Sequence, residues 1–229
     1  TQRLNNPQAM TDTLFSIEPQ RSGVHVILTI EMQNRIGRNV LAETGPLMQN
    51  AIDRIIHTTG LALYDGASFS QPGSGTIQSG VLSALNSQIL GNTTENPPEG
   101  APMYAWLNPY QIPDLMVAAG APVGPYTIPP GPSQEAYQRG IKAVQVIGGF
   151  EIRPSTNVRV DGSTLAHGGG HAKSMIVMVE EAVPQTFARD LEDMAGARAL
   201  WLYESFDYGS ITSGTGMGRL LSDATAPTA

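Results

Sequence analysis

The segment that most constrains the fold is residues 101–117, APMYAWLNPYQIPDLMV, in which a short strand is expected to lead directly into a helix. Aromatic and branched residues in its first half favour a pleated, packed strand. Asn108 is a good helix N-cap, and Pro109 follows at the first helical position, where its missing N–H costs nothing. Pro113, in the next turn, is expected to kink or shorten the helix. Such corners are common, so the significance of this one depends on the segments around it.

Hydrophobic periodicity predicts further elements on both sides of this corner. The β-branched run at 24–30, bounded by Gly23, predicts a strand. An apolar stripe with helical spacing extends from residue 40 to about 64, and Gly45-Pro46 interrupts it near its start. A second amphipathic helix is expected at 77–90, ending at Gly91. Together with the strands expected later in the chain, this irregular order favours an α+β fold over alternating βαβ units.

The remaining predicted elements are short. A helix capped by Ser133 is expected to extend to Tyr137. Strands are predicted at 141–147, 150–153, 174–179 and 200–206. Polar or Gly/Pro-rich loops are expected at 1–23, 66–76, 91–102, 119–132 and 161–171.

The composition favours a surface that is covered by other molecules. Charged residues make up 14% of the 229 residues, against about 25% in an average soluble domain. A low charge reduces the electrostatic repulsion between monomers, so self-association is the simplest way to bury such a surface. A plain, loop-rich monomeric domain is the alternative that composition alone leaves open.

The charge balance argues against a nucleic-acid coat. The net charge is −7, and binding to phosphates requires basic groups clustered on one face. The longest basic cluster is Arg35 with Arg38, and the only lysines are Lys142 and Lys173. The absence of cysteine excludes disulfides and thiolate metal sites and favours a reducing compartment. We find no signal peptide and no membrane span in the sequence. Because the sequence starts at Thr1 rather than Met, either a propeptide was removed or the sequence starts late.

No motif demands catalysis or a cofactor. His167 and His171 are separated by three glycines, which prevent a stable helix, and Asp161 is the only further candidate ligand nearby, so a flexible polar loop is preferred to a metal site. Lys173-Ser174 lacks the glycines of a phosphate-binding loop and precedes a strand. The glycines at 214, 216 and 218 lack the setting of a dinucleotide fingerprint and predict a mobile loop.

The other polar candidates are predicted to be surface residues. The chain contains no Gly-x-Ser-x-Gly elbow. Solvated surface is expected for the acidic residues Glu180, Glu181, Asp190, Glu192 and Asp193. His57 is expected at the flank of the long helix, and His25 lies on a strand without an evident partner. We therefore predict that the protein is not an enzyme and has no catalytic, cofactor-binding or metal-binding residues.

The order of the segments resembles that of a known family. The corner at 101–117 is preceded by LALYDGASFS (61–70) and followed by GIKAVQVIGGFEIRPSTNV (140–158), AKSMIVMVEEAV (172–183), RALWLYESFDYGSIT (198–212) and GMGRLLSDAT (216–225). This succession resembles the major capsid proteins of tailed bacteriophages, which have the Hong Kong 97-type fold. The resemblance extends from about Val24 to Thr225. It depends on the order and spacing of five segments rather than on one sharp motif.

The resemblance implies a division of the chain into named parts. Residues 1–33 would form an N-terminal arm and E-loop, with 24–30 as the returning edge of that loop, although the segment before Val24 is short for both. Residues 34–100 would begin the peripheral P domain, with a spine helix at 38–64 and a second helix at 77–90. Residues 101–189 would form the axial A domain, including strands at 148–154 and 173–179. Residues 190–229 would return to the P-domain sheet and form the C-terminal tail.

The implied function is structural. Such proteins self-assemble as pentamers and hexamers into an icosahedral head shell that encloses double-stranded DNA without binding it specifically. Scaffold, portal and decoration proteins are the expected partners, the virion is the expected location, and assembly is expected in the host cytoplasm. An encapsulin-type nanocompartment subunit is the alternative within the same fold. A small α+β enzyme that uses the His-Gly-rich segment is the alternative from another class.

Overall fold

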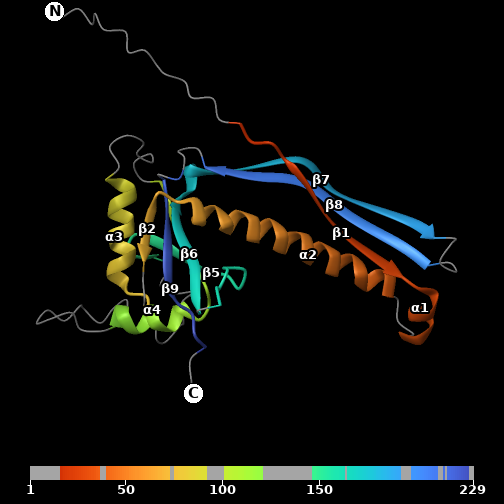
Figure 1. Ribbon diagram of the computed structural model, residues 1–229, viewed down its shortest axis with the longest axis horizontal. Coiled ribbons are helices and arrows are strands. Elements are labelled where there is room, and N and C mark those ends of the chain that lie inside the picture. The colour runs from red at the N-terminus through yellow and green to blue at the C-terminus, as the bar shows by residue number, and fades with distance from the viewer. Residues whose placement is uncertain are drawn as a thin grey trace, which may run out of the picture.

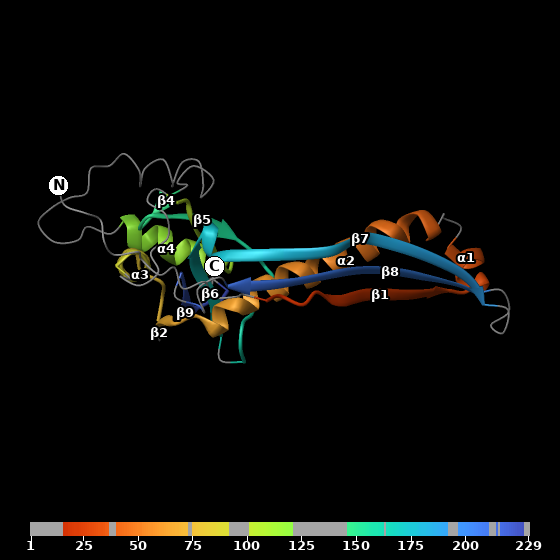
Figure 2. The same ribbon diagram turned by 90° about the horizontal axis from the view of Figure 1, so that it is seen from above.

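A long helix, α2 (Val40–Ala62), runs along a narrow sheet at one end of an elongated molecule, and a wider sheet with two helices forms the other end (Figures 1 and 2). The computed structural model describes residues 16–36, 40–72, 75–91, 101–120, 146–162, 164–191, 197–210, 214 and 216–226. The predicted elements at 133–137 and 141–145, and most of the loops predicted at 91–102 and 119–132, lie outside these ranges.

Helix α2 is the predicted spine. Its 23 residues correspond to a length of about 35 Å at 1.5 Å per residue, and the helix continues through Pro46. A 3-10 turn, η1 (Leu63–Gly66), follows α2 and includes Tyr64, near which the predicted helical periodicity ends. Both Ile52 and Ile55 belong to the apolar stripe and are predicted to be buried, and Ile52 is 0% exposed, as predicted. Ile55 is only half-buried, because the buried stripe of the helix passes through Met48 and Ile52.

The narrow sheet has three antiparallel strands in the order β1-β8-β7. They are β1 (Gln20–Leu28), β8 (Ala197–Ser210) and β7 (Ile176–Leu191). Val24, Val26, Leu200 and Leu202 alternate along β1 and β8 and pack against α2. The short helix α1 (Ile30–Ile36) connects β1 to the spine at the far tip (Figure 1).

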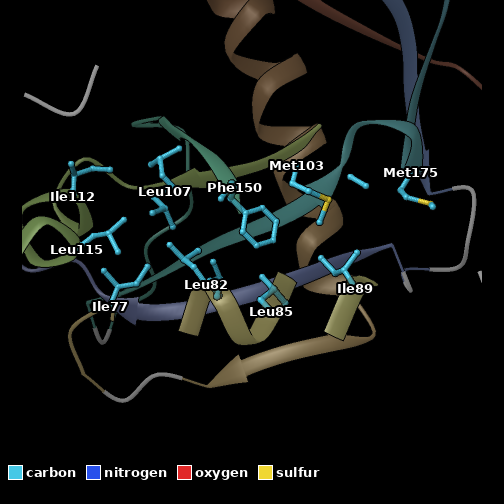
Figure 3. Packing of buried hydrophobic residues seen from close by; sticks show 14 residues of the cluster. Ile77, Leu82, Leu85, Ile89, Met103, Leu107, Ile112, Leu115, Phe150 and Met175 are labelled. Carbon is cyan, nitrogen blue, oxygen red and sulfur yellow. The ribbon is translucent and has the colours of Figure 1, made fainter. Parts of the chain in front are cut away.

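The wide sheet is mixed, with six strands in the order β2-β9-β6-β3-β5-β4. The bounds are β2 (Phe69–Pro72), β9 (Met217–Asp223), β6 (Leu165–Ala172), β3 (Met103–Leu107), β5 (Phe150–Pro154) and β4 (Val146–Ile147). Helices α3 (Ser79–Leu90) and α4 (Gln111–Gly120) supply side chains to its core. Phe150 lies at the centre of this core beside Leu82 and Leu85 of α3 (Figure 3).

The corner at 101–117 is confirmed as a strand followed by a helix, with two differences. Asn108 does accept a hydrogen bond from the Tyr110 N–H at 3.0 Å, but α4 begins at Gln111 rather than at Pro109. The first turn is closed by i to i+3 backbone bonds, from the Gln111 N–H to the Asn108 carbonyl at 2.9 Å, so the regular α-helix starts later. The Gln111 side-chain oxygen also accepts a bond from the Asn108 N–H at 2.7 Å, which completes a capping box around Asn108. Pro113 does not shorten α4, since it lies in the first turn, where its N–H would have no helical partner.

The described elements group differently from the predicted domain ranges. Helix α3, expected in the P domain, packs in the core of the wide sheet. The predicted boundary at 189/190 falls inside β7, which pairs with β8 from Ile176 to Leu191. Strand β9 falls in the range predicted to hold the return to the P-domain sheet and the C-terminal tail, and it pairs with β2 and β6. Strand β1, expected in the E-loop, pairs with β8 beside the spine.

None of the helices in the described ranges combines the length and apolar character needed to cross a lipid bilayer.

Candidate assembly surface

The face of the narrow sheet that points away from α2 is covered by stacked side chains. His25 of β1 stacks on Trp201 of β8, with ring centroids 4.8 Å apart. Phe187 of β7 stacks on Tyr203 of β8 at 5.4 Å, and the Arg21 guanidinium lies 4.8 Å from the Tyr203 ring. These cross-strand stacks stabilise the sheet without a second layer. We call Arg21, His25, Phe187, Trp201 and Tyr203 the aromatic ladder.

The distal half of β7 is not covered by other parts of the described structure. Residues 185–190 are exposed on both faces of the sheet, and Phe187 is 51% exposed despite its stacking contact. Because β7 is an outer strand of its sheet, one row of its backbone N–H and C=O groups has no neighbouring strand among those described. Exposed, uncovered edge strands are templates for pairing with another chain. The distal part of β7 is therefore the strongest candidate for contact with another subunit.

Other exposed apolar side chains lie outside the narrow sheet. Leu47 of the spine is 67% exposed, and Val146 of β4 is 62% exposed at the outer edge of the wide sheet. Ile30 and Met32 are exposed in α1, and Tyr110 is exposed at the corner before α4. Single exposed apolar residues are common on protein surfaces, so none of these marks a contact by itself.

The layer between α2 and the narrow sheet contains a buried carboxylate. Glu204 of β8 is 3% exposed, and its Oε2 has no hydrogen-bond partner among the described residues. Burial raises the pKa of Glu204, and the carboxylates of Glu180 and Asp53 raise it further. Glu204 therefore lies between the spine and its sheet, where keeping its carboxylate ionised costs free energy.

The end of the spine is tied to the wide sheet by Asp65 of η1. Its carboxylate contacts His167 Nδ1 of β6 at 2.8 Å and Arg159 at 3.2 Å, and Arg219 of β9 lies at 3.8 Å. Asp161 lies 3.8 Å from the other nitrogen of His167. The two arginines form ion pairs with Asp65, and the contact to His167 Nδ1 is a hydrogen bond. Within the described ranges, no group of three or more His, Asp or Glu side chains could hold a metal ion.

The segment His167–His171 is a strand rather than the flexible loop predicted from its glycines. It forms most of β6, and Gly168, Gly169 and Gly170 are buried in the middle of the wide sheet. A Cβ at Gly170 would lie 2.7 Å from the Phe150 ring, and one at Gly168 would lie 2.7 Å from the Trp106 carbonyl. The glycines are therefore needed for close packing and not for mobility.

The predicted loop at 214–218 is corrected only in part, because Gly214 and Gly216 lie in a turn and strand β9 begins at Met217. Gly216 and Gly218 are buried, and Gly218 belongs to β9, where a Cβ would collide with Leu85. Tight packing in both segments explains why glycine content predicted a loop where a central strand exists.

The other sequence candidates lie apart from one another. Glu180, Glu181 and Asp190 are exposed along β7, as predicted, whereas Glu192 and Asp193 lie outside the described ranges. Lys173 and Ser174 form a short 3-10 turn, η3 (Lys173–Met175), that leads into β7. The sequence did not reveal the aromatic ladder, because its five residues come from three separate strands. The alternation of residues around Phe187 and Trp201, which is typical of strands, was the local signal for it.

The sequence matches no family model and no curated protein. In contrast, the fold matches solved structures over nearly its whole length. A structure from Mycobacterium phage Che8 is 12% identical with a TM-score of 0.69, covering 96% of this chain and 78% of that one. The capsid of Ralstonia phage GP4 is 10% identical with a TM-score of 0.65, covering 92% and 75%. A Synechococcus elongatus encapsulin is 10% identical with a TM-score of 0.60, covering 92% and 77%.

At this level of identity the shared feature is the fold. The likeness covers 92–96% of this chain in the three comparisons, so it includes most of the spine, the narrow sheet and the wide sheet. The chain has the Hong Kong 97-type capsid fold, as the order of its sequence segments predicted.

Proposed function

We propose that this protein is a major capsid protein, which self-assembles into the icosahedral head shell of a tailed phage around double-stranded DNA. The observation that supports it most is the likeness to phage capsid structures over more than nine-tenths of the chain. The proposal includes a structural rather than catalytic role, pentamers and hexamers as assembly units, and a location in the virion after assembly in the host cytoplasm.

The exposed features described above support self-association. The uncovered distal part of β7 offers an edge for strand pairing, and Leu47 and Val146 offer apolar contacts at other places. The wide sheet with α3 and α4 would serve as the axial part of the subunit, and α2 with the narrow sheet as the peripheral part. Scaffold, portal and decoration proteins would be further partners, as expected for a shell of this kind.

An encapsulin-type shell is the second candidate. The specific observation in its favour is the match to the Synechococcus elongatus encapsulin at a TM-score of 0.60 over 92% of this chain. Both candidates form closed shells, but a phage head encloses DNA and an encapsulin encloses protein cargo. The content of the particle therefore separates them.

The first test is particle formation. The purified protein is expected to elute as closed shells or as capsomers, and negative-stain microscopy should show regular particles. Nuclease-protected DNA inside particles from an infected host would support the phage head, and a co-purifying cargo enzyme without DNA would support the encapsulin. A protein that stays monomeric across a wide concentration range, with no particles, would contradict both.

The second test addresses the β7 edge. Phe187→Ser removes an exposed ring from the aromatic ladder and is expected to reduce the yield of particles several-fold, while the dissociated subunit stays folded. Thr58→Ser is a matched control, since Thr58 is exposed on α2 and bonds only to its own helix. Equal particle yield from both variants would exclude the distal part of β7 as an assembly contact.

A further inference from the structure

A cavity of about 370 Å³ lies where the spine, the wide sheet and the narrow sheet meet. Its walls come from five parts of the chain: α2 with η1, β3, β5, β6, and the adjoining ends of β7 and β8. Cavities of this size hold small molecules in other proteins. Nothing in the proposed shell role requires an open space at this position.

The cavity is lined mainly by rings. Trp106, Tyr64 and Tyr208 contribute aromatic side chains, and His57 of the spine contacts Trp106 edge-on at 5.6 Å between centroids. Gly60 of α2 faces Tyr208, and a Cβ there would lie 3.2 Å from the Tyr208 ring. His57 is exposed and lines the cavity, so a path to solvent passes beside it. Flat aromatic walls favour a planar occupant that can stack or make edge contacts.

The polar groups in the lining are hydrogen-bond donors. Tyr64 places its hydroxyl 2.7 Å from Nδ1 of His171, and no other described residue accepts a hydrogen bond from that hydroxyl. We therefore assign the Tyr64 hydroxyl as the donor to Nδ1, which puts the imidazole proton on Nε2. Burial and the nearby Arg153 lower the pKa of His171 to about 4, so the ring is neutral at pH 7. No described residue accepts a bond from its Nε2–H.

Arg153 supplies the positive charge at the rim. Its Nε and Nη2 atoms contact Glu151 at 3.2 and 2.9 Å, which leaves Nη1 without a hydrogen-bond acceptor among the described residues. Its guanidinium lies 4.5 Å from the Tyr104 ring and 5.9 Å from the Trp106 ring, so it is held over the aromatic wall. No carboxylate belongs to the described lining of the cavity.

We propose that this cavity is a binding site for a small planar aromatic anion. The rings of Trp106, Tyr64 and Tyr208 would contact its flat body. The Arg153 guanidinium and the His171 Nε2–H would contact its carboxylate or other oxyanion. Because both sheets and the spine contribute to the walls, an occupant would also fix their relative arrangement and raise the melting temperature of the subunit.

The test uses 2-naphthoate as the probe on the purified full-length protein, with isothermal titration calorimetry as the measurement. We expect saturable binding with one site per chain. Neutral 2-naphthamide and the non-aromatic anion cyclohexanecarboxylate should each bind at least tenfold more weakly. Binding of all three compounds with equal affinity, or none by 2-naphthoate at millimolar concentration, would overturn the proposal.

Two variants locate the site. Arg153→Gln is expected to weaken 2-naphthoate about tenfold and to leave 2-naphthamide unchanged. Ile176→Phe adds volume to a half-buried wall residue and should abolish binding while the protein stays folded. Arg54→Gln is the control, because it removes an exposed spine cation that lines a separate cavity. Unchanged affinity in either the Arg153 or the Ile176 variant would place the probe elsewhere and refute this site.

This proposal and the shell proposal can fail separately. Particle formation is scored by microscopy and probe binding by calorimetry, so shells that do not bind 2-naphthoate refute only the cavity site. A protein that binds the probe but forms no particles refutes only the shell.

Discussion

The Tyr64 hydroxyl lies 2.7 Å from Nδ1 of His171, and this contact connects the end of the spine to the middle of the wide sheet. The two residues are 107 positions apart in sequence. His171 also packs against the Tyr104 ring at 5.9 Å between centroids. A buried imidazole therefore lies at the junction of the two halves of the subunit, and its protonation should affect how firmly they are joined.

Acidification is expected to weaken this junction through His171. Its folded pKa of about 4 lies below the ordinary 6.5, because burial and Arg153 disfavour the charged form. The unfolded chain therefore binds more protons between these values, and stability is present above pH 6.5 and lost as the pH falls toward 4. At pH 5 the loss should be about 2 kcal/mol. Urea unfolding of dissociated subunits at pH 7 and pH 5 measures it.

The control for this prediction is His171→Asn, which cannot titrate. Its free energy of unfolding should change less between pH 7 and pH 5 than that of the unsubstituted protein. If both proteins lose the same stability on acidification, the junction histidine does not cause the effect.

Glu204 should act in the opposite direction. Its raised pKa means that the folded protein binds the proton more tightly, so this group destabilises the fold when ionised and the penalty disappears as the pH falls. Glu204→Gln removes the charge and is expected to raise stability at pH 7 by about 1 kcal/mol. Thermal unfolding of this variant beside Glu18→Gln, an exposed acid, measures the effect. A lower melting temperature for Glu204→Gln alone would contradict the assignment.

The glycine packing in β6 can be tested by adding one methyl group. Gly169→Ala would place a Cβ against the Tyr64 ring and 2.8 Å from the Gly218 carbonyl, so we expect a loss of about 1–3 kcal/mol. Gly80→Ala in α3 meets nothing within 4 Å and should be neutral or stabilise by about 0.5–1 kcal/mol, because alanine favours a helix. Urea unfolding of the two variants should give opposite signs, and equal effects would mean that β6 is packed more loosely than described.

The spine offers a contrast between neighbouring residues. Ile52→Asp places a charge in the fully buried position between α2 and Leu202, and we expect no soluble, assembly-competent subunit. Ile55→Asp should be milder, since Ile55 is half-buried, and Arg54→Ala should have little effect because Arg54 is exposed. Soluble yield and particle yield rank the three variants. Similar yields for Ile52→Asp and Arg54→Ala would show that the buried face is misplaced.

The shell is predicted to be held by non-covalent contacts. Some shells of this fold are cross-linked by an isopeptide bond from an E-loop lysine, but residues 1–37 contain no lysine, and arginine cannot replace it as the amine nucleophile. Disulfides are excluded by the absence of cysteine. Particles assembled from these 229 residues alone and boiled in detergent should give a single band near 24.3 kDa. A ladder of pentamers and hexamers would disprove the prediction.

The sequence by itself determined the elements whose signals are local. The stripe of Met48 and Ile52 specified the spine, and Asn108 specified the corner between β3 and α4, because helical periodicity and capping depend on near neighbours in the chain. The order of such elements predicted the α+β class, and the resemblance of five segments to phage capsid proteins implied the capsid fold.

Only the tertiary structure decided what the glycine-rich segments do. His167–His171 forms a central strand, and this strand requires glycine. The rings of Tyr64 and Phe150, which are distant in sequence, occupy the space that side chains at Gly169 and Gly170 would need. The aromatic ladder and the pairing of Tyr64 with His171 likewise arise from strands and turns brought together by folding. A sequence pattern describes one segment at a time, whereas these contacts depend on how separate segments pack.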